Sequence, residues 1–411
     1  MRRDIATWVP LLLLAVLGAL AGIGNILQSE FGSRSADGVA DQLVVTSRSD
    51  RGPGSLRTAL FTAMKAPQPV TIRLDVDVVD VYVPLPPIAV DGLKIVGDAA
   101  NRTVLRRHAG DDGDDVPLLR IIADDVSLRG FDVDGGAGTA LRVTGSGFSA
   151  VELGIVNSGV GIDSVDVDEV EFRHCRFASN DIALRLSGRG TRATIADSDF
   201  HENIDAAVWI VFTGDSGSVR LFDNTIRGGR DGVVAVNSEI DIRGNFVGNF
   251  SRSGLSLSDA VATVSDNRLM NSRGIGISAA RLTNSVIIGN EISRNDQIGV
   301  LIVDANGLRV DRNEIYNNGY GIAAVGLKPI SASLKNNTLV GQSIDGLVAI
   351  GESPVIDGNR ALRNRQAGIR ILDLVLPDQP VIEALPQLAN NVMTDNGDDD
   401  VVYGKYVVRN P

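Results

Sequence analysis

The chain is short of the residues on which several classes of protein depend. Its 411 residues include one cysteine, three histidines, five lysines and only 4 % aromatic residues. A single cysteine excludes an internal disulfide and a cysteine-rich metal site. Acidic residues outnumber basic ones by 51 to 39, which argues against a protein that binds nucleic acid through its phosphates. Glutamate is also scarce, with 10 residues against 41 aspartates, and this composition argues against a helical protein.

The chain is instead rich in residues that favour turns, with 45 glycines and 26 asparagines. Among them one phrase recurs: a small residue, an aliphatic residue, any residue and a second aliphatic residue. Its mean spacing is about 23 residues. These units are too short for helices and fit strands with alternate side chains inward. The small residues are Gly161, Ala183, Ala207, Gly232, Gly254, Gly274, Gly299, Gly321, Gly346 and Gly368.

A second phrase, asparagine followed by any residue and an apolar one, keeps the same period. It begins at Asn224, Asn245, Asn267, Asn290, Asn313, Asn337 and Asn359, and Cys175 and Ser198 hold the equivalent earlier positions. Another asparagine often follows, at Asn180, Asn203, Asn249, Asn271, Asn295, Asn318 and Asn364. Two phrases with one period indicate a coil of two or three short strands, with the asparagines stacked in a ladder. Cys175 is then a small buried member of this ladder rather than a nucleophile.

The residues before the repeats predict a cap for the first coil, whose core edge would otherwise be exposed. The stretch from Ser55 to Met64 fits a short helix, with Ser55 as its N-cap and apolar residues on one face. That face consists of Leu56, Ala59, Leu60, Ala63 and Met64. The flanking segments Leu43–Thr46 and Val70–Leu74 read as strands.

The segment from Val44 to Leu60 contains the phrase Gly-Pro-Gly-Ser-Leu-Arg at residues 52–57. It resembles the opening of secreted right-handed parallel β-helix proteins of the pectin-lyase-like superfamily. The resemblance covers nearly all of residues 42–411. It implies an all-β fold: one right-handed parallel β-helix of about twelve coils with a short N-terminal capping helix. It implies no single activity, because that superfamily includes lyases, hydrolases, epimerases, adhesins and phage spikes.

The N-terminus carries an export or anchoring signal. Arg2 and Arg3 precede Trp8–Leu27, an uncharged run just long enough to cross a bilayer as a helix. Ala19–Ala21 offers a signal-peptidase site, so a cleaved signal peptide is the alternative. An anchor places the body on the extracytoplasmic face of the cell envelope, and cleavage makes it secreted or periplasmic.

The sequence therefore predicts five segments. Residues 1–28 are a signal anchor or signal peptide, 29–41 a linker, 42–110 the cap and first coils, 111–390 the repeats, and 391–411 a final coil or tail.

The outward residue of each repeated strand stacks on its counterparts about 4.8 Å away. Reading that position along the chain gives a row of three arginines, one aspartate and one tryptophan: Arg120, Arg142, Asp163, Arg185 and Trp209. Arginine pairs with carboxylates and an indole face stacks on a sugar ring, so the row is suited to an acidic polysaccharide. The alternative is a solvated face on which Asp163 only bridges Arg142 and Arg185. Asp163 and Arg185 are also the catalytic candidates.

The same row continues through Val234, Ser256, Gly276, Leu301, Ala323, Val348 and Arg370. In this part the outward positions are largely apolar, with Leu301, Val303, Ala323, Val325, Val348, Ile350 and Leu372 forming a strip. An apolar strip of this size is rarely left bare. We expect a loop or the tail around Leu374–Leu388 to cover it, or a partner to do so.

The catalytic phrases that the resemblance would bring are missing. The chain lacks the Gly-His-Gly and Arg-x-Lys phrases of the hydrolase branch and the Asp-Pro-His phrase of alginate epimerases. Asp181 and Asp205 precede strands of adjacent coils, where they fit a carboxylate pair or two turn aspartates. His174 precedes a ladder position and is expected in an exposed turn.

No cofactor is implied with certainty. Asp111–Asp115 and Asp395–Asp400 offer the oxygen ligands that Ca²⁺ prefers, and solvated loops are the alternative.

Three functions remain open. The first is an exported, membrane-tethered β-helix that binds a polysaccharide or a cell-envelope partner without catalysis. The second is a lyase, epimerase or hydrolase acting on an acidic glycan. The third is a structural or adhesive solenoid. No nucleic-acid partner is expected, because the arginines are scattered among more numerous acids.

Overall fold

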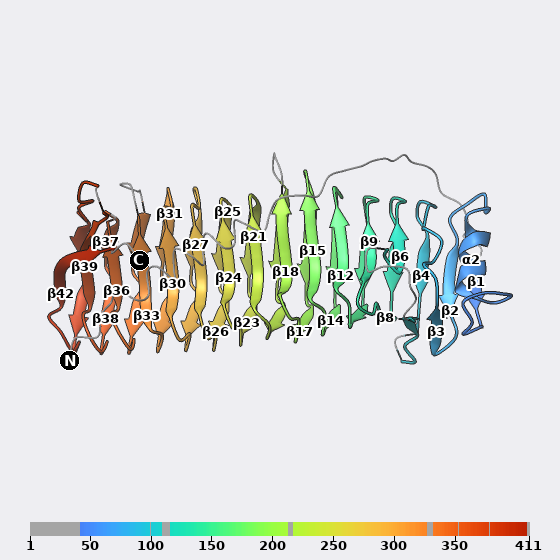
Figure 1. Ribbon diagram of the computed structural model, residues 1–411, viewed down its shortest axis with the longest axis horizontal. Helices are drawn as coiled ribbons and strands as arrows, with labels where there is room; N and C mark the ends of the chain where they lie inside the picture. The colour runs from blue at the N-terminus through green and yellow to red at the C-terminus, as the bar shows by residue number, and fades with distance from the viewer. Residues whose placement is uncertain are drawn as a thin grey trace. The chain divides into compact units, whose positions relative to one another are not determined.

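The computed structural model describes residues 42–98, 100–108, 116–212, 217–326, 332–351, 353–377 and 379–408. The run Trp8–Leu27 and the acidic run Asp111–Asp115 lie outside these residues. Within the described ranges, helix α2 (Leu56–Ala63) is too short to cross a membrane and no longer apolar helix is present. The remaining elements are strands in three parallel sheets, and the protein is a parallel β-solenoid of about twelve coils, as predicted (Figure 1).

The described residues fall into two compact units, divided between Ser256 and Leu257. From β4 onward, neighbouring strands of a sheet are three apart in chain order, because each coil contributes one strand to each sheet. We call the sheets A, B and C.

In the unit that ends at Ser256, sheet A consists of β1 (Gln42–Val45), β2 (Thr71–Leu74), β4 (Lys94–Val96), β7 (Ser127–Arg129), β10 (Ser149–Val151), β13 (Val170–Arg173), β16 (Arg192–Ala196), β19 (Ser218–Phe222) and β22 (Glu239–Arg243). Sheet B consists of β3 (Val78–Val81), β5 (Val104–Arg107), β8 (Asp132–Asp134), β11 (Gly154–Val156), β14 (Arg176–Ala178), β17 (Asp199–His201), β20 (Thr225–Arg227) and β23 (Phe246–Gly248). Sheet C consists of β6 (Leu119–Ile121), β9 (Thr139–Val143), β12 (Val160–Val165), β15 (Ile182–Gly188), β18 (Ala206–Phe212) and β21 (Asp231–Val236). Strand β24 (Ser253–Ser258) includes the boundary.

In the unit that begins at Leu257, sheet A consists of β25 (Val261–Ser265), β28 (Val286–Ile288), β31 (Leu308–Asp311), β34 (Ala332–Lys335), β37 (Val355–Asp357) and β40 (Gln387–Ala389). Sheet B consists of β26 (Arg268–Met270), β29 (Glu291–Ser293), β32 (Glu314–Tyr316), β35 (Thr338–Val340), β38 (Arg360–Leu362) and β41 (Val392–Thr394). Sheet C consists of β27 (Ile275–Ala280), β30 (Ile298–Val303), β33 (Tyr320–Val325), β36 (Leu347–Ile350), β39 (Ile369–Val375) and β42 (Val401–Val407).

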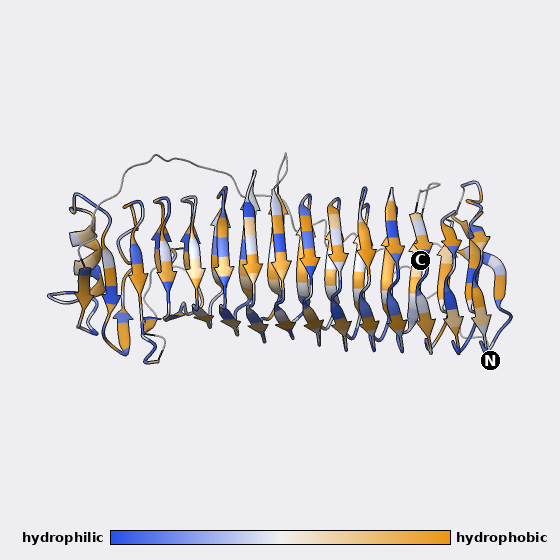
Figure 2. Ribbon diagram, turned by 180° about the vertical axis from the view of Figure 1, so that it is seen from behind, coloured by the Kyte–Doolittle hydropathy of each residue, from blue (hydrophilic) through white to orange (hydrophobic). Residues whose placement is uncertain are grey.

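The core runs between the three sheets, because alternate residues of each strand point inward. Hydrophobic and hydrophilic bands accordingly alternate along the strands (Figure 2). The small residue of the repeated phrase is explained by a close backbone approach. A Cβ atom on Gly161 would lie 2.3 Å from the carbonyl oxygen of Ala183 on the next coil.

This contact corrects one predicted position. The equivalent glycine in the sixth phrase is Gly276, whose Cβ would lie 2.6 Å from the carbonyl oxygen of Gly299. The predicted small residue, Gly274, lies two residues too early. Ser278 rather than Gly276 therefore holds the outward position, where it pairs in register with Leu301.

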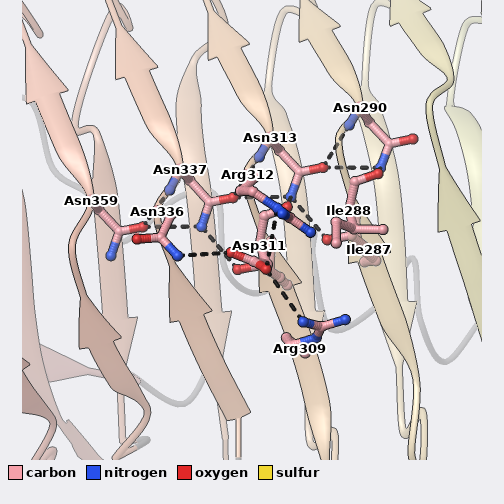
Figure 3. Close-up of polar contacts among 11 residues, drawn as sticks. Ile287, Ile288, Asn290, Arg309, Asp311, Arg312, Asn313, Asn336, Asn337 and Asn359 are labelled. Carbon is pink, nitrogen blue, oxygen red and sulfur yellow. Dashed lines mark hydrogen bonds and ion pairs between the residues drawn. The ribbon is translucent and has the colours of Figure 1, made fainter.

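The predicted asparagine ladders are confirmed. In the second unit Asn290, Asn313, Asn337 and Asn359 lie one above another (Figure 3). The Oδ1 atom of Asn313 accepts hydrogen bonds from both the backbone N–H and the Nδ2 of Asn290, each at 2.9 Å. The Nδ2 of Asn313 also donates to the carbonyl of Ile287 at 2.9 Å. Each side chain thus satisfies buried backbone groups that no strand pairs.

A second ladder lies five residues after the first. In the second unit it runs through Ser272, Asn295, Asn318, Gln342, Asn364 and Asn396. In the first unit it includes Ser158, Asn180 and Asn203. The predicted members Asn249 and Asn271 are wrong by one residue, because Phe250 and Ser272 hold the buried positions.

The residues directly before the ladder positions share a left-handed backbone, which explains the excess of asparagine, aspartate and glycine. Asn249 and Asn271 belong to this group, with φ of 65° and 60°. Before the first ladder the group comprises His174, Asp197, Asp223, Gly244, Asp266, Gly289, Arg312, Asn336, Gly358 and Asn390. His174 is therefore in an exposed turn, as predicted.

Cys175 occupies the ladder position expected of it. Its backbone N–H donates to Ser198 Oγ at 3.1 Å, and its Sγ contacts the carbonyls of Ala150 and Arg173. Burial raises the pKa of the thiol to about 11. The thiolate, which is the reactive form, is therefore disfavoured.

The cap forms as predicted with one exception. Ser55 accepts a hydrogen bond from the backbone N–H of Thr58, and four residues of the predicted face are buried. Figure 1 shows α2 beside β1. Met64 is wrong as a core residue, because it is 44 % exposed at the C-cap.

The apolar strip of the second unit is covered rather than bare. Five residues of the strip are buried and at most 7 % exposed: Leu301, Ala323, Val348, Ile350 and Leu372. Leu374 belongs to the same cluster, and Leu376 and Ile382 pack against it, in agreement with the predicted role of the tail. Backbone hydrogen bonds between Leu374 and Ile382 hold this cover in place.

We predict that Asn313→Leu lowers the free energy of unfolding by about 3 kcal/mol, because it leaves the N–H of Asn290 and the carbonyl of Ile287 buried without partners. Asn237→Gly is the matched control, because Asn237 is an exposed turn residue whose positive φ suits glycine. Urea denaturation of both variants measures the difference. Equal losses would contradict the ladder as the source of stability.

We also predict that Cys175 resists alkylation by iodoacetamide at pH 8 in the folded protein, because only about one thiol in a thousand would be ionised at a pKa near 11. In denaturant the thiol should react at the rate of a model peptide. Mass spectrometry of the labelled chain reports both rates, and rapid modification of the folded protein would contradict the buried position.

Candidate functional site

The predicted row of outward residues is present on sheet C of the first unit. Arg120 on β6 pairs in register with Arg142 on β9, and Arg142 pairs with Asp163 on β12. Asp163 then pairs with Arg185 on β15, and Arg185 with Trp209 on β18. We call these five residues the arginine row. Parallel pairing at one residue per strand brings all five together, although 21 to 24 positions separate neighbours in the sequence.

Asp163 is the centre of the arginine row and is only 1 % exposed. Its Oδ1 accepts a hydrogen bond from Arg185 Nε at 2.7 Å. Its Oδ2 accepts from Arg142 Nε at 3.0 Å and lies 3.0 Å from Arg142 Nη2. The bridge that the sequence suggested between the two arginines is therefore formed, and the carboxylate faces a guanidinium on each side.

The two arginines keep part of their surface open. The side chain of Arg142 is 36 % exposed and that of Arg185 is 25 % exposed, whereas Arg120 is exposed. The hydrogen bond to Asp163 raises the pKa of Arg185 above its usual value. Three guanidinium groups and one carboxylate leave the row with a net charge of 3 − 1 = +2. The row is thus a permanently cationic surface, in which Asp163 holds Arg142 and Arg185 in place.

Trp209 ends the arginine row on an apolar base. It packs with Val211 against Ala206, Val234 and Val236, which are buried. The indole is itself half-buried, so part of it remains accessible beside Arg185. An indole held in this way offers a flat apolar contact without a large loss of side-chain entropy.

The other predicted site residues lie in structural contacts. Asp181 and Asp205 are on adjacent coils, where the N–H of Asp205 donates to the carbonyl of Asp181 at 2.8 Å. The carboxylate of Asp205 pairs with Arg230. In the run Asp395–Asp400, Asp398 pairs with Arg370. Over the described ranges no group of three potential His, Cys, Asp or Glu ligands gathers around a metal site.

Sequence reasoning missed two buried ion pairs of sheet C. Asp231 lies between Arg252 and Arg230, and burial raises its pKa in spite of both arginines. Asp345 receives two hydrogen bonds from Arg370, at 2.8 and 2.9 Å. Nearby, burial first and the charge of Asp345 second raise the pKa of Tyr320 to about 12. In the sequence Arg252 follows Asp231 by 21 residues and Arg370 follows Asp345 by 25, which is close to the length of one coil. This spacing could have predicted both pairs.

We predict that Asp163→Asn lowers the free energy of unfolding by about 2 kcal/mol. Breaking a buried ion pair costs more than this, but both arginines are partly solvated. Asp168→Asn is the control, because Asp168 pairs with Arg192 on the open surface and such pairs contribute little. Chemical denaturation compares the two variants. A loss no larger than that of the control would show that Asp163 does not organise the row.

Known proteins support the fold. A family described as "Right handed beta helix region" matches residues 209–359. No curated protein sequence matches the chain.

Among solved structures, the surface adhesin PfbA of Streptococcus pneumoniae aligns with a TM-score of 0.50 and 12 % identity, covering 89 % of this chain and 93 % of PfbA. The A-module of the mannuronan C-5 epimerase AlgE6 of Azotobacter vinelandii gives a TM-score of 0.48 and 13 % identity, covering 90 % and 99 %. At such low identities the likeness concerns the fold alone. The chain is a right-handed parallel β-helix repeat protein.

Proposed function

We propose that this protein is an exported β-helix that binds an acidic polysaccharide along the arginine row without transforming it. The observation that carries the proposal is the fixed pair of guanidiniums at Arg142 and Arg185. Each is held by the same buried carboxylate and keeps part of its surface open, and Arg185 lies beside the half-buried indole of Trp209. Preformed groups of this kind bind without the cost of ordering flexible side chains.

The charges and spacing favour an anionic chain molecule. Guanidinium groups form paired hydrogen bonds with carboxylates, and the row carries a net charge of +2. Five positions on adjacent strands extend over roughly 19 Å, which suits a linear ligand rather than a small anion. The indole at one end adds the apolar contact that a sugar ring accepts.

The same contacts argue against catalysis by these residues. Both oxygens of Asp163 face arginines, so no lone pair is aimed at a substrate proton. Arg185 is stabilised in its protonated form, because its hydrogen bond to Asp163 raises its pKa, and a base must lose its proton first. Catalysis on an acidic glycan is the alternative, and it requires a base outside this row.

The proposal includes a place in the cell envelope. PfbA, which shares the fold, is a surface adhesin. The run Trp8–Leu27 would serve as a membrane anchor with the β-helix on the extracytoplasmic side, and cleavage after Ala19–Ala21 would release it.

We predict that oligouronates bind the full chain and that Arg185→Gln and Trp209→Ala each weaken binding by about tenfold. Arg192→Gln is the matched control, because Arg192 pairs with Asp168 on the open surface away from the row. Isothermal titration calorimetry at two salt concentrations measures affinity. Binding should weaken at high salt, because salt screens exposed charges.

Two results would overturn the proposal. If both site variants bind as tightly as Arg192→Gln, the row is not the site. If the wild-type chain generates unsaturated uronate absorbance or epimerised sugar, and Arg185→Gln abolishes it, the protein is an enzyme and the catalytic alternative holds.

A further inference from the structure

A cluster of aromatic and acidic groups lies at the first strand of sheet B, away from the strands of the arginine row. Asp80 is on β3, Tyr82 directly follows β3, and His108 directly follows β5. The rings of Tyr82 and His108 are stacked, with centroids 4.5 Å apart and planes 14° from parallel. We call these three residues the Tyr82 platform.

The platform is fixed from below. His108 Nε2 is hydrogen-bonded to Asp80 Oδ1 at 2.7 Å, which sets the position of the imidazole. The backbone N–H of His108 donates to the carbonyl of Val81 at 2.9 Å, and that of Asp80 donates to the carbonyl of Arg48 at 2.9 Å. Two hydrogen bonds, one from the ring and one from the backbone, fix His108, and the phenol ring of Tyr82 stacks on this fixed imidazole.

Tyr82 is largely open to solvent. Strand β3 begins sheet B, so Tyr82 stacks on the following coil and has no preceding strand of that sheet beside it. The residue is 57 % exposed. The other stacked ring pair in the described ranges, Phe177 with Phe200, is buried in the core.

Three polar atoms around the phenol ring have no hydrogen-bond partner among the described residues: Asp80 Oδ2, His108 Nδ1 and the Tyr82 hydroxyl. A structural role would be complete with the bond between His108 and Asp80, and it would leave the exposed phenol ring unexplained. An open aromatic face beside a carboxylate oxygen matches a pyranose ring, with its apolar face on the phenol and its hydroxyls donating to the carboxylate.

We propose that the Tyr82 platform is a second glycan-binding site that takes a neutral pyranose. The carboxylate of Asp80 accepts hydrogen bonds from neutral hydroxyls. Asp77 is paired with Arg48, and Arg106 on β5 pairs in register with Asp80, so two carboxylates and two guanidiniums leave this neighbourhood without the net positive charge that would attract an anionic sugar. The platform therefore differs from the cationic arginine row in the sugar it selects, and the inference does not depend on the function proposed for that row.

The test is binding of neutral hexasaccharides of glucose, mannose and N-acetylglucosamine to the full chain, followed by saturation-transfer NMR and calorimetry. We expect at least one to bind, and Tyr82→Ala to weaken it by roughly tenfold. Tyr82→Phe keeps the ring and should stay within about threefold of the wild type. Asp80→Asn should weaken binding, because the amide is a poorer acceptor than the carboxylate.

The matched control is Tyr403→Ala, which removes another exposed tyrosine, 70 % accessible on β42. It should leave binding unchanged, and circular dichroism should show all variants folded. Arg185→Gln should also leave neutral sugar binding unchanged, whereas Tyr82→Ala should leave oligouronate binding unchanged. The two sites can thus fail independently.

Two outcomes would overturn the inference. One is that no neutral hexasaccharide binds the wild type at millimolar concentration. The other is that Tyr82→Ala and Tyr403→Ala bind equally well, because the platform would then be a structural stack only.

Discussion

Stacking one coil on the next in strict register is the constraint on which this structure depends. Parallel strands exchange backbone hydrogen bonds only when equivalent residues align, so a side chain at one position meets its own counterpart on the neighbouring coil. That requirement fixes the small residue of each phrase, as at Gly161, where the next coil leaves no room for a Cβ. It also favours asparagine inside the turns, because a primary amide can donate to one copy of itself and accept from another.

The same register creates the surface on which a function can be built. Identical positions on adjacent coils bring like charges about 4.8 Å apart, which is unfavourable without an opposite charge between them. In the arginine row Asp163 separates Arg142 from Arg185, whereas Arg120 and Arg142 remain direct neighbours on the exposed side of the row. The pairs of Asp231 with Arg252 and of Asp345 with Arg370 are further instances in which one coil neutralises the next. Burial of the aspartate in each case makes the arginine geometry rigid.

The sequence was sufficient for the fold and for the order of residues in the row, because a repeat fixes register without reference to distant contacts. Its errors came where two candidates satisfied the same local pattern. Gly274 and Gly276 both precede an isoleucine, and only the contact with the next coil decides between them. Asparagine suits a left-handed turn as well as a ladder, and in the structure Asn249 and Asn271 both adopt the left-handed turn conformation. Met64 continues the helical periodicity but lies where the helix ends.

The site was less predictable than the fold. The repeat predicts which outward residues align. The burial of Asp163, however, depends on how the side chains of Arg142 and Arg185 pack over it. The stack of Tyr82 on His108 joins residues 26 positions apart in the first coils, where the repeat is irregular. The spacing of the repeat therefore does not predict it. The buried ion pairs likewise depend on rotamers of arginine, which a repeat pattern does not specify.

The separation of inward and outward positions has an evolutionary consequence. The inward residues and the turn residues carry the stability of each coil, whereas the outward residues of the arginine row take part in neither the hydrophobic core nor the ladders. Mutation can therefore change the surface one coil at a time. Duplication of a coil would add a new outward residue to the row without displacing its neighbours from their strands. The arginine row is one set of outward residues on a scaffold that tolerates many others.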